Sequence, residues 1–431
     1  SNLMWNSSEY SHRDCKGYRQ GVMEPDQNLC QDARWLKLYQ SWKGKVLTTD
    51  EETLRNRYMN RLYSMAQTVV DKYNAEYDCN LGIQRYSESG FSLPYIHSDT
   101  IYIDKSVHVW LALYSFGNPN LFIYYRLMKG MLDFNNADGA SKLLELIKAE
   151  YHSSSKRFHH LLSQNPEWIT ALVMAITLHE LGHHRFKKDR NSYQLLASDV
   201  KEFLQNRPFK VSKDYVPNAD FKAIGINLEE TRDFVEEAYG AIIEDDLEEE
   251  SFLEELAADS FVFNHFSQSL SGCGVNQAIA SSMALSGSCV FFLEYANRIN
   301  KLFFTPINED KKERVKHNLI ATIVDSVNSR IRAIYQDFHI NNFFASENID
   351  DDSRMLYSTL VGVPLYDFNE SLDVEFMKSL QPFQDILNEG GQIEFDENKL
   401  KLVRQEVDTF ENTIIRSILN ELDKKSTFTI R

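Results

Sequence analysis

Residues 177–184 have the sequence Thr-Leu-His-Glu-Leu-Gly-His-His and contain a His-Glu-x-x-His motif. On an α-helix, residues four positions apart lie on the same face, so His179 and His183 can bind one metal ion. Glu180 follows directly and can take a proton from a water molecule on that ion. His184 is turned by roughly 100° from His183, so we expect it to be an exposed neighbour or a residue that supports a ligand.

The sequence before this motif predicts a helix that runs through it. Asn165 is a preferred N-cap residue, and Pro166 suits the first helical position. Leu172 and Ile176 start an apolar stripe at helical spacing, which the two histidines of the motif continue. The apolar run at 169–178 is too short to cross a membrane. The motif is therefore expected at the end of a buried helix.

A second, acidic motif offers a third metal ligand, because catalytic zinc usually has three protein ligands. Ser251 and Glu254 have capping-box spacing, which assigns Glu254 to the backbone at a helix start. Glu255 and Asp259 then share one helix face. Glu255 is the natural third ligand, and Asp259 can accept the free N–H of a ligating imidazole. Two intervening alanines let this helix approach another closely. The alternative is a solvated acidic helix, since the preceding segment is rich in acidic residues.

These two motifs together resemble those of the gluzincin metallopeptidases. His-Glu-Leu-Gly-His followed by Glu-x-x-Ala-Asp is most similar to the branch with the CAAX-prenyl-type and HtpX-type proteases. It is also similar to the soluble phage-exclusion peptidases of the Lit type, in which the two motifs are closer together. The resemblance implies a Zn²⁺ cofactor held by His179, His183 and Glu255, with Glu180 as general base and Asp259 as support for a ligand histidine.

The resemblance also implies a fold and a source for the oxyanion donor. The fold is mainly α (α+β): a zincin-like helical domain with a small β-sheet beside the metal-binding helix, plus extra helices. At 305–314 the chain has Thr-Pro and Glu-Arg where the same branch has His-Pro and Glu-Arg, so Thr305 replaces a histidine. Arg314 is the leading candidate for the oxyanion donor. The sequence leaves four others open: Tyr239, His265, Tyr295 and His317.

The pattern of polar and apolar segments predicts three parts. Residues 1–45 form a polar N-terminal arm, residues 46–345 the zincin-like metallopeptidase domain, and residues 346–431 a C-terminal helical segment. The domain has an insert at about 185–250, between the two metal motifs. A long connection at this place suggests either a lid over the cleft or scaffolding.

Local patterns predict a small sheet and several helices around the motifs. Alternating residues at Thr100–Asp104 predict a strand, and we assign part of residues 82–104 to the sheet. The last helix is expected either to dock on the body or to bind a partner. Helices are predicted at residues 50–77, 107–116, 120–132, 140–164, 192–203, 229–243, 309–338, 373–387 and 397–422.

Composition limits the compartment and the partners. The 431 residues are 43% hydrophobic and 12% aromatic, which is enough for a folded core. The net charge of −17 argues against broad binding to nucleic acid or to anionic membranes. Five cysteines without a Cys-x-x-Cys pair and a polar first stretch without a signal-peptide core favour the cytoplasm. We expect a protein or peptide substrate, no nucleic acid and no membrane span; the oligomeric state stays open.

The function predicted from these observations is zinc-dependent hydrolysis of peptide bonds, most simply by an endopeptidase. A metal-activated water attacks, and Glu180 acts as the general base. One alternative is a zinc-fold binding or regulatory module without turnover, although such a module has no need of a base. The other alternative is a metallohydrolase that cleaves a non-peptide bond.

Overall fold

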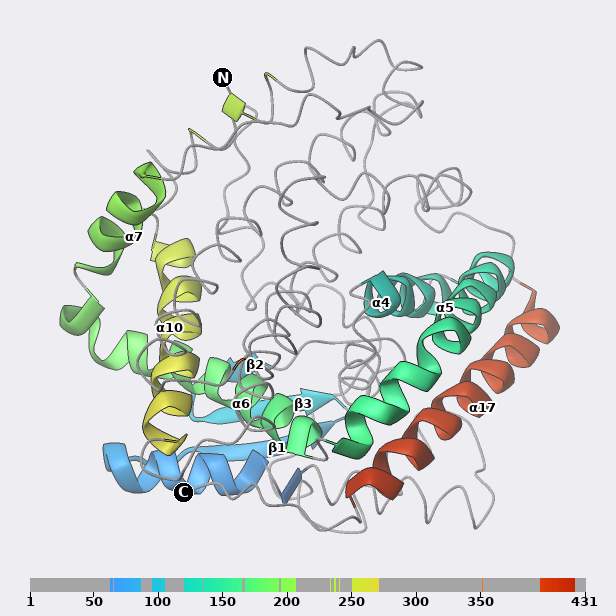
Figure 1. The fold of residues 1–431 in the computed structure, drawn as a ribbon, viewed down its shortest axis with the longest axis horizontal. Coiled ribbons are helices and arrows are strands. Elements are labelled where there is room, and N and C mark those ends of the chain that lie inside the picture. Colours follow the sequence, from blue (N-terminus) through green and yellow to red (C-terminus); the bar gives the residue numbers. More distant parts are fainter. Residues whose placement is uncertain are drawn as a thin grey trace.

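The computed structural model shows a protein that is mainly helical, with one three-stranded β-sheet, in the part of the chain that it describes (Figure 1). This confirms the mainly α class. The described residues are 63–64, 66–86, 95–104, 120–133, 135–164, 167–193, 195–206, 250–270 and 396–422, with single positions at 233, 236, 237, 240 and 351.

The sheet precedes the long helices in the chain and has the strand order β1-β3-β2. β3 (Thr100–Asp104) lies between β1 (Gly82–Tyr86), which is parallel to it, and β2 (Tyr95–His97), which is antiparallel. The turn between β2 and β3 contains Ser98 at a φ of 54°, a conformation that suits a tight hairpin. As the central strand, β3 is buried on both faces. The strand predicted at 100–104 and the sheet within 82–104 are confirmed.

Helices α4 (Asn120–Asp133) and α5 (Ala137–Gln164) form an antiparallel pair joined by a short turn. Asn135 in this turn has a φ of 59°, which asparagine tolerates better than most residues. The Asn136 side chain accepts a hydrogen bond from the Gly139 backbone N–H at 2.9 Å and so caps the start of α5. α5 therefore begins a few residues before the predicted helix at 140–164.

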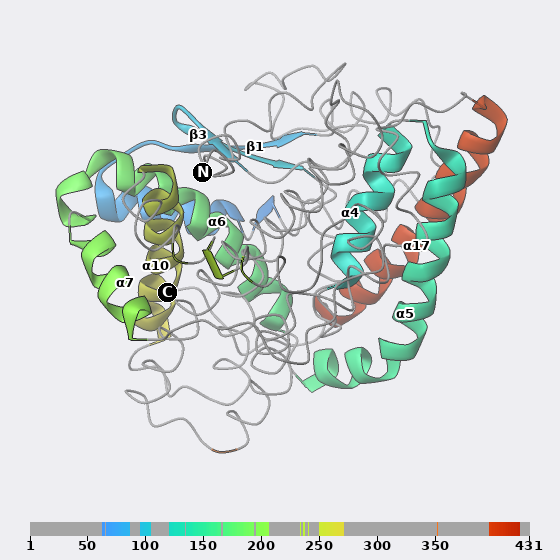
Figure 2. The same cartoon turned by 90° about the horizontal axis from the view of Figure 1, so that it is seen from above.

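The C-terminal helix α17 (Glu397–Leu422) lies along α5 in both views (Figures 1 and 2). It is tied to α4 by polar contacts as well as by apolar packing. Arg404 Nη2 donates to the Leu132 carbonyl at 3.2 Å, near the end of α4. The buried Glu411 carboxylate accepts from the Tyr125 hydroxyl at 2.7 Å and pairs with Lys129 Nζ at 2.6 Å. α17 thus docks on the body of the protein, which was one of its two predicted roles.

Helix α6 (Glu167–Lys188) is the central element, and every residue from 173 to 184 is buried. α10 (Glu250–Leu270) packs against it, and β2 contacts it as well. After α6 come the short 3₁₀ helix η4 (Arg190–Tyr193) and α7 (Leu196–Gln205), which contacts α10 (Figure 2). The arrangement places the end of α6 between α10 and the sheet.

Most of the predicted helices that fall in the described ranges are found. Those at 120–132, 397–422 and through the His-Glu-x-x-His motif are present as α4, α17 and α6, and the one at 50–77 is present over residues 66–77. The helix predicted at 192–203 is α7, which starts four residues later because η4 precedes it. The N-terminal arm and the helices predicted at 107–116, 309–338 and 373–387 lie outside the described residues, and 229–243 is described only at single positions.

Among the described helices, none combines the length and the apolar character that a bilayer crossing needs.

Candidate metal centre

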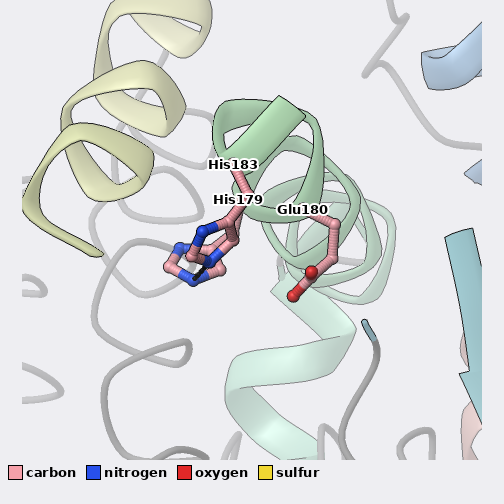
Figure 3. A group of neighbouring side chains, drawn as sticks. All are labelled: His179, Glu180 and His183. Carbon is pink, nitrogen blue, oxygen red and sulfur yellow. Dashed lines mark hydrogen bonds between the residues drawn. The ribbon is translucent and has the colours of Figure 1, made fainter. Parts of the chain in front are cut away.

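The end of α6 brings His179, Glu180 and His183 together (Figure 3). A possible ligand atom of each lies within 4.8 Å of those of the other two. The two imidazole rings meet edge to face, with centroids 4.8 Å apart, while Glu180 extends beside them (Figure 3). All three residues are buried, with at most 5% of each exposed. Burial of three ionisable groups is costly unless they are paired or hold an ion, so this cluster is a candidate functional site.

A close contact between α6 and α10 allows the second helix to reach this cluster. A Cβ atom on Gly182 would lie only 2.8 Å from the backbone Cα of Ala258. Glycine is therefore required at this crossing, and Ala257 and Ala258 are fully buried beside it. The prediction that the two alanines allow a close helix approach is confirmed. Because the helix backbones are this close, short acidic side chains on α10 can contact the imidazoles on α6.

Glu255 on α10 completes a triangle of ligand atoms with the two histidines. His179 Nε2 lies 3.2 Å from His183 Nε2 and 3.2 Å from Glu255 Oε2, and His183 Nε2 lies 3.5 Å from Glu255 Oε1. Tetrahedral zinc with ligands at about 2.0–2.1 Å requires ligand atoms about 3.3 Å apart. The distance between the two nitrogens, and the distance from each nitrogen to one oxygen of the Glu255 carboxylate, are close to this value.

The outer nitrogens of the two imidazoles face carboxylates of α10. His179 Nδ1 lies 3.3 Å from Asp259 Oδ1, and His183 Nδ1 lies 3.0 Å from Glu254 Oε1. A proton on each Nδ1 directs the lone pair of each Nε2 toward the other ring and Glu255. Three electron-rich atoms then converge, and a cation between them stabilises the arrangement. Carboxylates that face the outer nitrogens of ligand histidines in this way are common around protein-bound metal ions.

The role of Glu254 corrects one prediction from the sequence. Ser251 and Glu254 have capping-box spacing, but α10 already includes Glu250, so Ser251 is inside the helix. The Glu254 carboxylate lies against His183 Nδ1 and also 3.8 Å from Lys187 Nζ. The same Ser-x-x-Glu spacing occurs within helices, so the pattern could not distinguish the two roles. The available signal was that Glu254 directly precedes Glu255, the residue expected to face the histidines.

His184 is buried rather than exposed, which is a second correction. Its Nδ1 forms a 2.7 Å hydrogen bond with the Tyr73 hydroxyl, from the helix at residues 66–77. Burial raises the pKa of Tyr73 and lowers the pKa of His184, so a protonated phenol faces a neutral imidazole. His184 thus anchors the far face of α6 to the neighbouring helix. It is not among the side chains that approach Glu255 in the contacts above.

Burial and nearby carboxylates change the pKa values of the three clustered groups. Burial lowers the pKa of His179, but its contacts with Asp259 and Glu255 outweigh this effect and raise the pKa to about 10. Burial also lowers the pKa of His183, and the charge of Glu255 raises it above its usual value. For Glu180, burial raises the pKa to about 7, against the opposing charges of the histidines. The carboxylates thus stabilise positive charge at the imidazole pair, which a divalent cation can also provide.

The oxyanion donor is not located by the structure. Arg314, Tyr295 and His317 lie outside the described residues, and so does Tyr239. His265 is on α10, where its ring packs 4.2 Å from the Phe261 ring, centroid to centroid, with Tyr77 also close. Burial lowers the pKa of His265. Its position in this aromatic cluster is explained by packing.

Comparison with protein-family models, with curated proteins and with solved structures finds no match for this chain.

Proposed function

We propose that this protein is a zinc-dependent peptidase of the gluzincin type. The observation that carries the proposal is the triangle of His179 Nε2, His183 Nε2 and the Glu255 carboxylate, with sides of 3.2–3.5 Å. Glu180, which follows the proposed ligand His179 in the chain, lies beside this triangle (Figure 3). Two helices whose motifs are far apart in the chain supply these groups, which makes a chance grouping improbable.

The ligand set favours zinc over harder cations. Two imidazoles and one carboxylate are a common catalytic zinc set, whereas calcium and magnesium prefer oxygen ligands alone. Three protein ligands leave a coordination position for substrate or water, and structural zinc sites are usually closed by four. When bound, zinc polarises a carbonyl group and lowers the pKa of a water ligand to about 7.

Glu180 is proposed as the general base. It would take a proton from the attacking water and later give it to the leaving amine. Its pKa, raised by burial to about 7, suits both proton transfers near neutral pH. Asp259 would keep the His179 imidazole oriented. A buried carboxylate beside a metal triangle has no role in a site that only binds, so catalysis is favoured over a regulatory module.

The position of the sheet supports a peptide as substrate. β2 contacts α6, and within the described residues it has β3 as its one neighbouring strand. An extended peptide can add to such an edge through backbone hydrogen bonds. In a zincin-like fold, this edge would present the peptide to the metal helix. A hydrolase of another bond has no comparable support from the sheet.

We also propose that the protein acts in the cytoplasm. Cys79, the cysteine within the described residues, is a free thiol. Free thiols and the absence of a Cys-x-x-Cys pair fit a reducing compartment.

The test is metal analysis of the purified protein followed by digestion of a broad peptide library. We expect one zinc per chain and cleaved peptides. Glu180→Gln is the matched control: it should retain zinc and lose turnover by about 10²–10⁴-fold, because an amide cannot accept the proton. Turnover in Glu180→Gln equal to wild type would exclude the base role, and a wild-type protein without metal would exclude the proposal.

A further inference from the structure

Glu254 makes a contact that the gluzincin resemblance does not imply. Asp259 supports His179, as expected from the motif, but His183 has a carboxylate partner of its own. Glu254 Oε1 lies 3.0 Å from His183 Nδ1, and the Glu254 side chain is only 13% exposed. α10 therefore supplies a separate carboxylate to the outer nitrogen of each imidazole.

We propose that Glu254 is a positioning residue for His183, and this inference rests on the proposed metal site. Glu254 accepts the Nδ1 proton and thereby holds the tautomer in which Nε2 carries a lone pair. The alternative tautomer would place a proton on Nε2, where the metal must bind, and would set an Nδ1 lone pair against a carboxylate. Both effects oppose metal binding, so the contact favours the ligating form of His183.

Glu254 is not itself a ligand in this arrangement. Its contacting oxygen lies on the outer edge of the His183 ring, away from Nε2 and Glu255. Lys187, one turn further along α6, lies 3.8 Å from the same oxygen. The positive charge of Lys187 favours the ionised form of the Glu254 carboxylate at that outer position. Because the Lys187 side chain is 35% exposed, its own contribution is small.

The experiment measures metal affinity in the full chain, by competition between the protein and a chelator for Zn²⁺. Glu254→Ala should bind Zn²⁺ about 10–100-fold more weakly than wild type, which is the usual range for such supporting contacts. Glu254→Gln keeps an oxygen that can accept from Nδ1, so it should recover most of this loss. Substitution with Co²⁺ gives a second readout, because the visible spectrum reports the ligand geometry. We expect an altered spectrum in Glu254→Ala and a nearly normal one in Glu254→Gln.

Two controls separate positioning from a general effect of charge. Glu250→Gln removes an exposed acid from the same helix, where it pairs with Arg190, and should leave the affinity unchanged. Lys187→Met removes the other contact of the Glu254 oxygen and should change the affinity less than about threefold. A loss in Lys187→Met as large as that in Glu254→Ala would overturn the assignment, because the surface ion pair would then be the important contact.

Two further outcomes keep this inference distinct from the proposed function. If wild type binds Zn²⁺ and both Glu254 variants bind it equally well, the positioning role is wrong while the metal site stands. If wild type binds no Zn²⁺, the metal site itself is wrong, and the positioning role with it. Circular dichroism shows whether Glu254→Ala folds. If it does not, Glu254→Met carries the test, because methionine is of similar size but offers no oxygen to accept from His183 Nδ1, and it should lose Zn²⁺ affinity by the same about 10–100-fold.

Discussion

Within the part of the chain that the structure describes, the α4–α17 contact and the α6–α10 contact each bury charged side chains, and they differ in how these charges are balanced. Between α4 and α17, the contact joins one cation to one anion: Lys129 and Glu411 lie 2.6 Å apart, each 3% exposed, and Tyr125 donates to the same carboxylate. Between α6 and α10, four carboxylates surround two imidazoles, and Lys187, which contacts Glu254, is partly exposed. The first cluster holds a fold together, whereas the second has an excess of acid that a divalent cation would balance.

The largest expected effect is the loss of zinc binding when a ligand of the α6–α10 cluster is removed; the α4–α17 cluster should not depend on metal. His183→Ala should abolish stoichiometric zinc binding and turnover, because it removes one corner of the ligand triangle. In wild type, a chelator should lower the melting temperature, since zinc at 1,000 times its Kd adds about 4 kcal/mol to the free energy of unfolding. In His183→Ala the chelator should have no effect. Equal chelator sensitivity in both proteins would place the metal elsewhere.

The α4–α17 cluster should respond to mutation in stability alone. Lys129→Met leaves the Glu411 carboxylate buried without its cation, which should lower the free energy of unfolding by about 3–5 kcal/mol. Combining it with Glu411→Leu should restore most of that loss, because an apolar pair of similar size can replace a buried ion pair. Denaturant unfolding measures both values. Zinc affinity should stay at the wild-type level, and a change would show that the clusters are coupled.

Asp259→Asn tests the carboxylate that the sequence did predict. The amide can still face His179 Nδ1 but lacks the negative charge, so zinc affinity should fall about 10–100-fold, or about 1.4–2.7 kcal/mol. Chelator competition gives the value. The corresponding change Glu254→Gln also replaces a carboxylate by an amide that can accept from His183. Because Glu254 is less buried than Asp259, its loss of zinc affinity should be smaller. Equal losses would mean that both imidazoles depend on charge to the same degree.

A change of similar size, measured as stability, is expected at the helix crossing between α6 and α10. Gly182→Ala places a Cβ 2.8 Å from the Ala258 backbone, so α6 and α10 must separate. We expect a loss of about 1–3 kcal/mol in the free energy of unfolding, together with weaker zinc binding. Ala257→Gly, at the buried residue next to Ala258, adds no atom that could clash and serves as the control. Unchanged zinc affinity in Gly182→Ala would show that the centre tolerates helix separation.

Much of the candidate site follows from the sequence because it depends on spacing within single helices. Residues four apart share a helix face, so the His179–His183 and Glu255–Asp259 pairs could each be predicted. The close crossing at Ala258 could also be predicted from its small side chain. That the two pairs meet is a fact of tertiary packing, and the motif resemblance was the signal for it.

The parts that could not be predicted depend on contacts between distant residues or on ambiguous local patterns. Glu254 has the spacing of a helix cap and also that of an interior helical turn, so its contact with His183 needed the structure. His184 was expected either at the surface or as support for a ligand, because the pattern of one helix cannot show that Tyr73 contacts its ring. The Lys129–Glu411 pair joins two helices that are far apart in the chain, and no local pattern links them.

The central claim is that two imidazoles on α6 and one carboxylate on α10 hold a single divalent cation. Anomalous diffraction at the zinc absorption edge, from crystals grown with zinc, tests it most directly. The account predicts one strong peak about 2.0–2.2 Å from His179 Nε2, His183 Nε2 and an oxygen of Glu255. A map with no peak at this position, or with zinc bound only at other residues, would contradict it.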